Sequence, residues 1–144
     1  MNTLPKLESI FLQEDKLLAV LPQYHPLADM EYFPINALCS YPFMLLEKGG
    51  KSDIWEIFQK HDISANIRFT TWDDYAIMSM VEGGLGISIL PQLILKRTPY
   101  KIIAKELEVP AYRKIGLALH KKKKASLAMK AFLKYIVSMR KREY

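Results

Sequence analysis

The sequence contains almost no cysteine, since Cys39 is the single one in 144 residues. One thiol cannot form an intramolecular disulfide, which excludes a disulfide-stabilised fold and disfavours a periplasmic location. Cys39 lies between Leu38 and Ser40, next to an apolar run. We therefore predict a small buried side chain at this position rather than a nucleophile.

Long apolar segments and targeting signals are also missing. No stretch approaches the length of a transmembrane helix, and residues 1–11 lack the cationic start and apolar run of a signal peptide. Half of the residues are apolar and a quarter are charged, which is ordinary globular usage, and the length suits one domain with a sizeable core. We expect a compact cytoplasmic domain without membrane contacts.

Patterns typical of catalysis are absent as well. The histidines at positions 25, 61 and 120 are far apart, and none has the spacing of a metal motif. The glycines within 83–86 follow a helical pattern and precede a strand pattern, which is the reverse of a dinucleotide fingerprint. We predict that the chain is not an enzyme and has no catalytic residue, no metal site and no cofactor.

The most informative segment that is present runs from Thr70 to Pro91, TTWDDYAIMSMVEGGLGISILP. Its pattern predicts a capped helix, a glycine turn, a short buried strand and a proline stop. Thr71 is the expected N-cap, with Asp74 as the acid of a capping box. The glycines 83–84 are expected to supply positive φ angles, and Gly86 to allow close approach to a neighbouring segment.

Two further segments occur in a fixed order around this one. Asp15–Ala28, DKLLAVLPQYHPLA, has the form of a strand followed by a His-Pro-Leu-Ala turn, and Arg113–Phe132 has a strand, a polar break and the start of a helix. Together the three segments resemble the effector-sensing domain of LysR-type transcriptional regulators, in which a helix, a Gly-Leu-Gly-Ile-type turn and a strand ending in Leu-Pro recur. The resemblance extends from about Ile10 to Ile136.

This resemblance implies an α/β fold of the type II periplasmic-binding-protein kind. Residues 14–106 are expected to form one complete lobe with an open, mostly parallel sheet. Residues 1–13 and 107–144 are expected to be a remnant of the second lobe, so that 1–144 is a partial effector-binding domain. The family's winged helix-turn-helix has no counterpart in this chain. The implied function is sensing of a small-molecule effector, with transcription controlled through that absent domain.

The residue pattern by itself also favours an α/β fold. Short apolar runs alternate with amphipathic segments, which is typical of an open sheet covered by helices. The expected strands are 17–21, 43–47, 66–70, 87–90 and 100–104, and the expected short helices outside the central segment are 35–39, 53–61 and 92–96.

Two loops are candidates for ligand binding. Each loop follows a predicted strand and enters a helix, and the free backbone N–H groups at a helix start favour a small anion. The two strands are expected to be neighbours in the sheet. By resemblance, both loops contribute to the effector cleft. The predicted effector-binding residues, expected to lie close together at one sheet edge, are Gly49, Gly50, Lys51, Ser52, Thr70, Thr71 and Trp72. In the simpler interpretation, Ser52 and Thr71 only cap their helices.

Charge is concentrated at the C-terminal end and bears on possible partners. Residues 113–144 have a net charge of +10, against −4 for residues 1–112, and Lys121–Lys124 is the densest run. A solvated surface explains this run better than a nucleic-acid site does, because no aromatic residues interleave the lysines. A small nucleic-acid-binding module therefore stays an alternative, as does a solute-binding protein of the same fold. DNA contact is expected only through the missing winged helix.

Self-association is the remaining expectation. An apolar stripe on the last predicted helix would lack its usual cover in a partial lobe, and exposed apolar stripes favour association. We therefore expect a homodimer or higher oligomer. The stripe consists of Ala128, Phe132, Tyr135, Ile136 and Met139.

Overall fold

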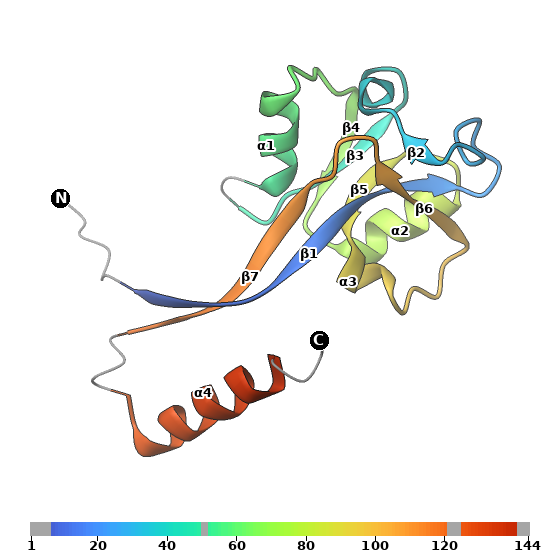
Figure 1. Ribbon diagram of the computed structural model, residues 1–144. Helices are drawn as coiled ribbons and strands as arrows, with labels where there is room; N and C mark the ends of the chain where they lie inside the picture. Colours follow the sequence, from blue (N-terminus) through green and yellow to red (C-terminus); the bar gives the residue numbers. More distant parts are fainter. Residues whose placement is uncertain (1–6, 50–51, 121–124, 141–144) are drawn as a thin grey trace. The chain divides into compact units, whose positions relative to one another are not determined.

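The computed structural model describes residues 7–49, 52–120 and 125–140 (Figure 1). The chain forms two compact units. The larger contains residues 15–113, and the smaller contains residues 1–14 and 114–144. These divisions lie at 14/15 and 113/114, close to the first predicted lobe boundary and seven residues beyond the second. That the units correspond to the lobes of a two-lobed sensor stays a prediction.

A mixed sheet forms the centre of the larger unit. Strand β1 (Glu8–Pro22) pairs antiparallel with both β5 (Ser88–Pro91) and β6 (Ile102–Leu107). The short β2 (Tyr32–Phe33) runs parallel to β6, and β3 (Phe43–Leu46) runs parallel to β4 (Ile67–Thr71). A parallel bridge between Phe43 and Ile87 joins β3 to the start of β5. Strand β1 is therefore antiparallel to β5 and β6, whereas β2–β6 and β3–β4 are parallel pairs, so the α/β fold has mixed strand pairing.

Two helices cover opposite faces of this sheet. Helix α1 (Asp53–Lys60) packs against residues such as Leu17 and Ile89, whereas α2 (Asp74–Glu82) packs in a second cluster with Val20 and Leu90. Successive side chains of a strand point to opposite faces, which is why neighbouring residues of β1 and β5 separate between the two clusters. The 3₁₀ helix η1 (Ile35–Cys39) and the short α3 (Gln92–Leu95) complete the unit.

The smaller unit contains the start of β1, most of β7 (Tyr112–Leu119) and helix α4 (Leu127–Arg140). Strand β7 pairs with β1. None of the described residues of α4 is fully buried, and Phe132, Tyr135 and Met139 of its predicted apolar stripe are exposed. The Lys121–Lys124 run lies outside the described residues. Among the helices that are described, none is long and apolar enough to cross a membrane.

The structure corrects three local predictions. Asp73, not Thr71, is the N-cap of α2, and its Oδ1 accepts hydrogen bonds from the N–H groups of Tyr75 and Ala76. Gly83 has a φ of −73°, so of the expected pair only Gly84, at 79°, is left-handed. Cys39 is exposed, because η1 turns Ile35 and Leu38 inward and leaves the adjacent position facing outward.

The His-Pro-Leu-Ala turn after β1 depends on a neutral histidine. The Nδ1 atom of His25 accepts a hydrogen bond from the N–H of Leu27 at 3.1 Å, and its ring meets Tyr41 edge to face. Nδ1 must therefore be unprotonated, which places the proton of the neutral ring on Nε2. Burial lowers the pKa of the His25 imidazole below its ordinary value of 6.5.

We predict that this histidine makes the fold less stable in mild acid. Below pH 6.5 the unfolded chain takes up a proton that the folded chain resists. The free energy of unfolding should therefore decrease as the pH falls from 6.5 through the lower folded pKa, and His25 should add no pH dependence above 6.5. Urea unfolding at a series of pH values checks this against His25→Asn, which retains an acceptor but does not titrate. A constant stability difference between the two proteins across the range would contradict the prediction.

Candidate functional site

The two predicted loops emerge at the same edge of the sheet. Strands β3 and β4 are parallel, with Leu46 opposite Thr71, and the N–H of Glu47 donates to the carbonyl of Thr71 at 3.0 Å. This bond holds the carboxyl ends of the two strands together. The edge is where helix N-termini and their free N–H groups are presented in sheets of this type.

The first loop, which follows β3, contains a turn at Gly49 and the start of helix α1 only a few residues later. Gly49 has a φ of 72°, a left-handed conformation that favours glycine. Ser52 is the N-cap of α1, and its Oγ accepts a hydrogen bond from the N–H of Trp55 at 3.3 Å. Asp53 and Glu56 place acidic side chains in the first turn, where the helix dipole favours them. The capping role predicted for Ser52 is therefore confirmed.

Removing the Ser52 hydroxyl should weaken α1 without removing the fold. We predict that Ser52→Ala lowers the free energy of unfolding by about 1 kcal/mol, the usual cost of losing an N-cap. Ser52→Asp, which restores an acceptor, should recover most of this stability. Chemical denaturation of the three proteins measures the difference, and equal stabilities would show that the cap contributes nothing.

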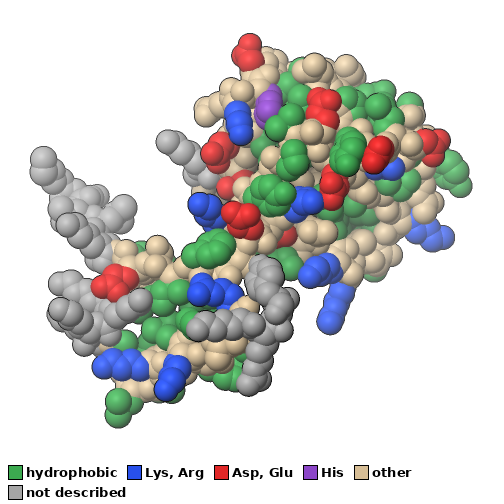
Figure 2. All heavy atoms as spheres, viewed as in Figure 1, with side chains coloured by type: hydrophobic (Ala, Val, Ile, Leu, Met, Phe, Trp, Pro, Cys, Tyr) green, Lys and Arg blue, Asp and Glu red, His purple; other side chains and the backbone are tan. Residues whose placement is uncertain are grey.

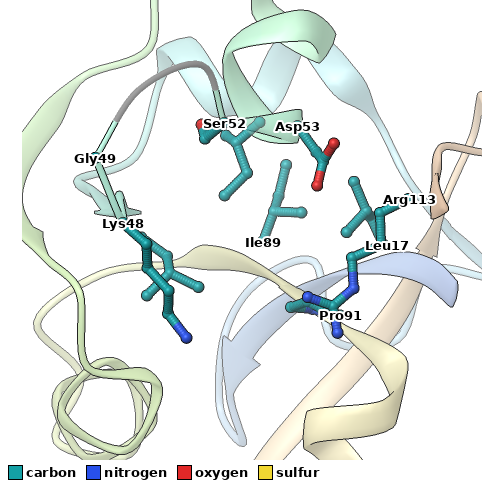
Figure 3. Close-up of a pocket in the computed structure, with 10 residues that line it drawn as sticks. Leu17, Lys48, Gly49, Ser52, Asp53, Ile89, Pro91 and Arg113 are labelled. Carbon is teal, nitrogen blue, oxygen red and sulfur yellow. The ribbon is translucent and has the colours of Figure 1, made fainter. Parts of the chain in front are cut away.

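A cavity of about 210 Å³ opens beside this helix start (Figure 3). Its base is apolar and includes Leu17 of β1 and Ile89 of β5, while charged and polar groups come from the first loop, from α1 and from Arg113. The lining residues are Leu17, Leu46, Lys48, Gly49, Ser52, Asp53, Ile54, Ile89, Pro91 and Arg113. An apolar cavity with a few convergent polar groups is the usual form of a small-molecule site.

Two cations at the cavity are held by carboxylates. Arg113 makes an ion pair of 2.8 Å with Asp15, whose side chain is buried. Lys48 makes an ion pair of 3.1 Å with Asp74 at the start of α2. Figure 3 shows Ser52 and Arg113 on different sides of the cavity. The cavity therefore has a helix N-terminus on one side and a fixed guanidinium on another.

The structure brings together only part of the predicted site. Gly49 and Ser52 line the cavity, and Gly50 and Lys51 lie outside the described residues. Thr70, Thr71 and Trp72, at the end of β4, do not belong to the lining.

Of Ser52 and Thr71, only Ser52 lines the cavity, so one wall shared by both hydroxyls stays a prediction. The helices that follow them, α1 and α2, pack in different core clusters. The Thr71 hydroxyl instead accepts a hydrogen bond from the N–H of Asp73 at 3.2 Å. Trp72 is 77 % exposed, so it does not pack beneath the loop. Effector contacts for the residues of both loops stay a prediction.

Three charged residues of the cavity were missing from the predicted set. Lys48 and Asp53 flank the first loop. Their position next to the predicted residues Gly49 and Ser52 would have been enough to include them in the predicted site. Arg113 is 98 residues from its partner Asp15, so the sequence alone gives no sign that the two meet. Within the described ranges, no group of three or more histidine, cysteine, aspartate or glutamate side chains is arranged to hold a metal ion.

Comparison with known proteins identifies the family of domains that this chain matches. Residues 2–140 match the LysR substrate binding domain. The chain is 30% identical over 130 residues to a Bacillus subtilis protein named uncharacterized HTH-type transcriptional regulator YvbU, covering 89% of this chain and 44% of that protein. It therefore spans less than half of that relative's length.

Solved structures of similar fold include two regulatory domains that were determined with a ligand. The Synechocystis PCC6803 CcmR regulatory domain in complex with 2-PG has a TM-score of 0.83 at 25% identity, over 98% of this chain and 70% of that one. The effector binding domain of QuiR in complex with shikimate has a TM-score of 0.83 at 24% identity, over 100% of this chain and 70% of that one.

Proposed function

Because the chain belongs to the LysR substrate-binding-domain family, we propose that it is the effector-sensing part of a bacterial LysR-type transcriptional regulator. In this role it binds a small anionic molecule in the cytoplasm and catalyses no reaction. Ligand binding biases the conformation of the sensor, and a DNA-binding domain outside these 144 residues transmits the change to a promoter.

The cavity beside α1 is the observation that carries this proposal. It combines an apolar base with the N-terminus of a capped helix and with Arg113, which together suit an anion with a small organic body. The CcmR regulatory domain, at 25% identity, holds a small molecule, which supports a ligand-binding role for the same fold.

The two alternative functions receive less support. The family match favours a regulator over a solute-binding protein. On the viewed face of the larger unit, positive and negative side chains are interspersed (Figure 2). A nucleic-acid-binding surface would instead gather lysine and arginine side chains on one face. The basic C-terminal residues on which the nucleic-acid alternative depends belong mostly to the smaller unit, and Lys121–Lys124 lie outside the described residues.

Nuclear magnetic resonance offers a direct test of the proposed site. We expect at least one member of a panel of small organic acids, amino acids, sugars and phosphate esters to shift the backbone amide signals of Gly49, Ser52 and Ile89. Amides that do not belong to the cavity lining, such as that of Lys101, which donates to Glu82 of α2, serve as the internal control. A panel that shifts no cavity amide, or a ligand that shifts only amides elsewhere, would contradict the proposal.

We also predict that the chain self-associates. The exposed apolar side chains of α4, among them Phe132, Tyr135 and Met139, favour association in water. Sedimentation velocity should show a homodimer or a higher oligomer whose fraction rises with concentration. Phe132→Glu combined with Tyr135→Lys should shift the equilibrium toward monomer. A protein that stays monomeric at all concentrations tested would exclude this assembly.

A further inference from the structure

Arg113 is held by its buried partner in a defined orientation. Its Nε donates to Asp15 Oδ2 at 2.9 Å, and its Nη2 lies 2.8 Å from the same oxygen. The other carboxylate oxygen, Oδ1, accepts a hydrogen bond from the backbone N–H of Leu93 at 3.1 Å. Asp15 is only 2 % exposed, so its carboxylate has little freedom to move. The guanidinium is therefore fixed along one edge by a carboxylate that is itself fixed.

The opposite side of the guanidinium is free to bind a ligand. Asp15 takes the Nε–H and one Nη2–H, which leaves both Nη1–H groups and the second Nη2–H. One hydrogen from each terminal nitrogen points in the same direction, which matches the two oxygens of a carboxylate. Arg113 lines the cavity, and its side chain is 29% exposed. No partner from the described residues occupies this edge.

The remaining walls define what kind of carboxylate fits. Leu17, Ile89 and Pro91 give the cavity an apolar base next to Arg113, which suits a hydrocarbon body. Asp53 adds a negative charge at the start of α1, and Lys48 is already paired with Asp74. A second carboxylate on the ligand would therefore meet repulsion from Asp53, and among the described lining residues no unpaired lysine compensates it.

We propose that Arg113 is the anchor for the carboxylate of the effector, with Asp15 as the residue that positions it. The ligand class is then a small carboxylic acid with one carboxylate and an apolar body. This inference rests on the proposed function, because it concerns the same cavity. Asp15 acts through Arg113 and is too deeply buried to touch the ligand itself.

The inference is tested with a pair of probes that share one apolar body and differ in having a charged carboxylate or a neutral amide. Cyclohexanecarboxylate and its neutral amide, cyclohexanecarboxamide, are titrated into the full chain labelled with ¹⁵N. We expect the carboxylate, but not the amide, to shift the guanidinium ¹⁵N signals of Arg113. Arg113→Lys keeps the positive charge but loses the pair of parallel N–H donors of the guanidinium. It should weaken carboxylate binding about tenfold, as expected for the loss of one charge-assisted hydrogen bond. Arg68→Lys, on the exposed strand β4, is the matched control and should leave binding unchanged.

Asp15→Asn separates positioning from a purely structural role. In the wild type, the Arg113 Nε–H should exchange slowly with water, because Asp15 Oδ2 holds it. In Asp15→Asn, this exchange should accelerate and carboxylate affinity should fall, while the cavity amides continue to respond to cyclohexanecarboxamide. A variant that is less stable but binds the carboxylate with unchanged affinity would overturn the positioning role.

The other outcomes distinguish this inference from the proposed function. If the carboxylate shifts the cavity amides but Arg113→Lys binds it equally well, the anchor is refuted and the proposed site stands. If the carboxylate shifts no signal of Arg113, the anchor is likewise refuted. The proposed function fails separately, when no compound of the broader panel binds at this cavity.

Discussion

Replacing Gly86 with alanine is expected to lower the free energy of unfolding by roughly 3 kcal/mol, at the upper end of the usual cost of overpacking. A Cβ atom at this position would lie 2.3 Å from the carbonyl oxygen of Pro42 and 3.0 Å from its carbonyl carbon. These are backbone atoms, and the same oxygen accepts a hydrogen bond from the N–H of Ile87 at 2.9 Å. Relief of the clash must therefore displace the bridge between β3 and β5.

Urea unfolding of three glycine variants provides the measurement and its controls. Gly83 has an ordinary φ, and a Cβ there would have its nearest contact at 3.5 Å, so Gly83→Ala should change stability by less than about 0.5 kcal/mol. Gly84 has open space but a φ of 79°, so Gly84→Ala should cost about 1 kcal/mol from backbone strain alone. If Gly86→Ala and Gly83→Ala lowered the free energy of unfolding equally, the close approach of Gly86 to Pro42 would not be what makes alanine unfavourable at position 86.

This close approach also matters for the cavity. Gly86 and Ile87 bring the start of β5 against β3, and two residues later Ile89 reaches the base of the cavity. Leu46 at the end of β3 belongs to the same lining. The close approach at Gly86 therefore determines how the parts of the cavity lining contributed by β3 and β5 lie against each other.

The local elements of the fold were predictable because each has a strong pattern of its own. Helix α1 was expected over 53–61 and is found at Asp53–Lys60, and η1 was expected and found at 35–39. The N-cap of α2 was predicted wrongly because two good capping residues lie two positions apart. Thr71 still pairs with Leu46 in the strand ladder, so the chain cannot leave the sheet until Asp73.

The arrangement of the site was less predictable, because it depends on strand order. The chain runs from β3 outward to β4 and then back across β3 to β5. Right-handed crossovers in opposite directions place their helices on opposite faces, which accounts for the packing of α1 and α2 in different core clusters. The sequence contains two similar strand–loop–helix units, and nothing in it indicates that the chain changes direction across the sheet between them. The meeting of Asp15 with Arg113 is equally invisible, since it depends on β1 and β7 being neighbours.

Replacing Asp15 with alanine is expected to cost roughly 3 kcal/mol of folding stability, the usual penalty for breaking a buried ion pair from one side. The variant leaves the Arg113 guanidinium without its buried partner and the N–H of Leu93 without its acceptor. Two groups then lose their hydrogen bonds at once. Each unsatisfied buried group adds to the cost, which is why the loss should exceed that of a single hydrogen bond.

The adjacent residue of β1 provides a matched control for this last prediction. Lys16 makes an ion pair of the same length, 2.8 Å, with Glu106, but on the exposed side of the strand. Glu106→Ala should therefore lower stability far less than Asp15→Ala, because water screens and replaces an exposed pair. The double variant Asp15→Leu with Arg113→Met should recover much of the loss, since it removes both charges instead of leaving one behind. Chemical denaturation measures all three proteins. If Asp15→Ala and Glu106→Ala lost equal stability, the buried pair would not be what holds β1 and β7 together at Arg113.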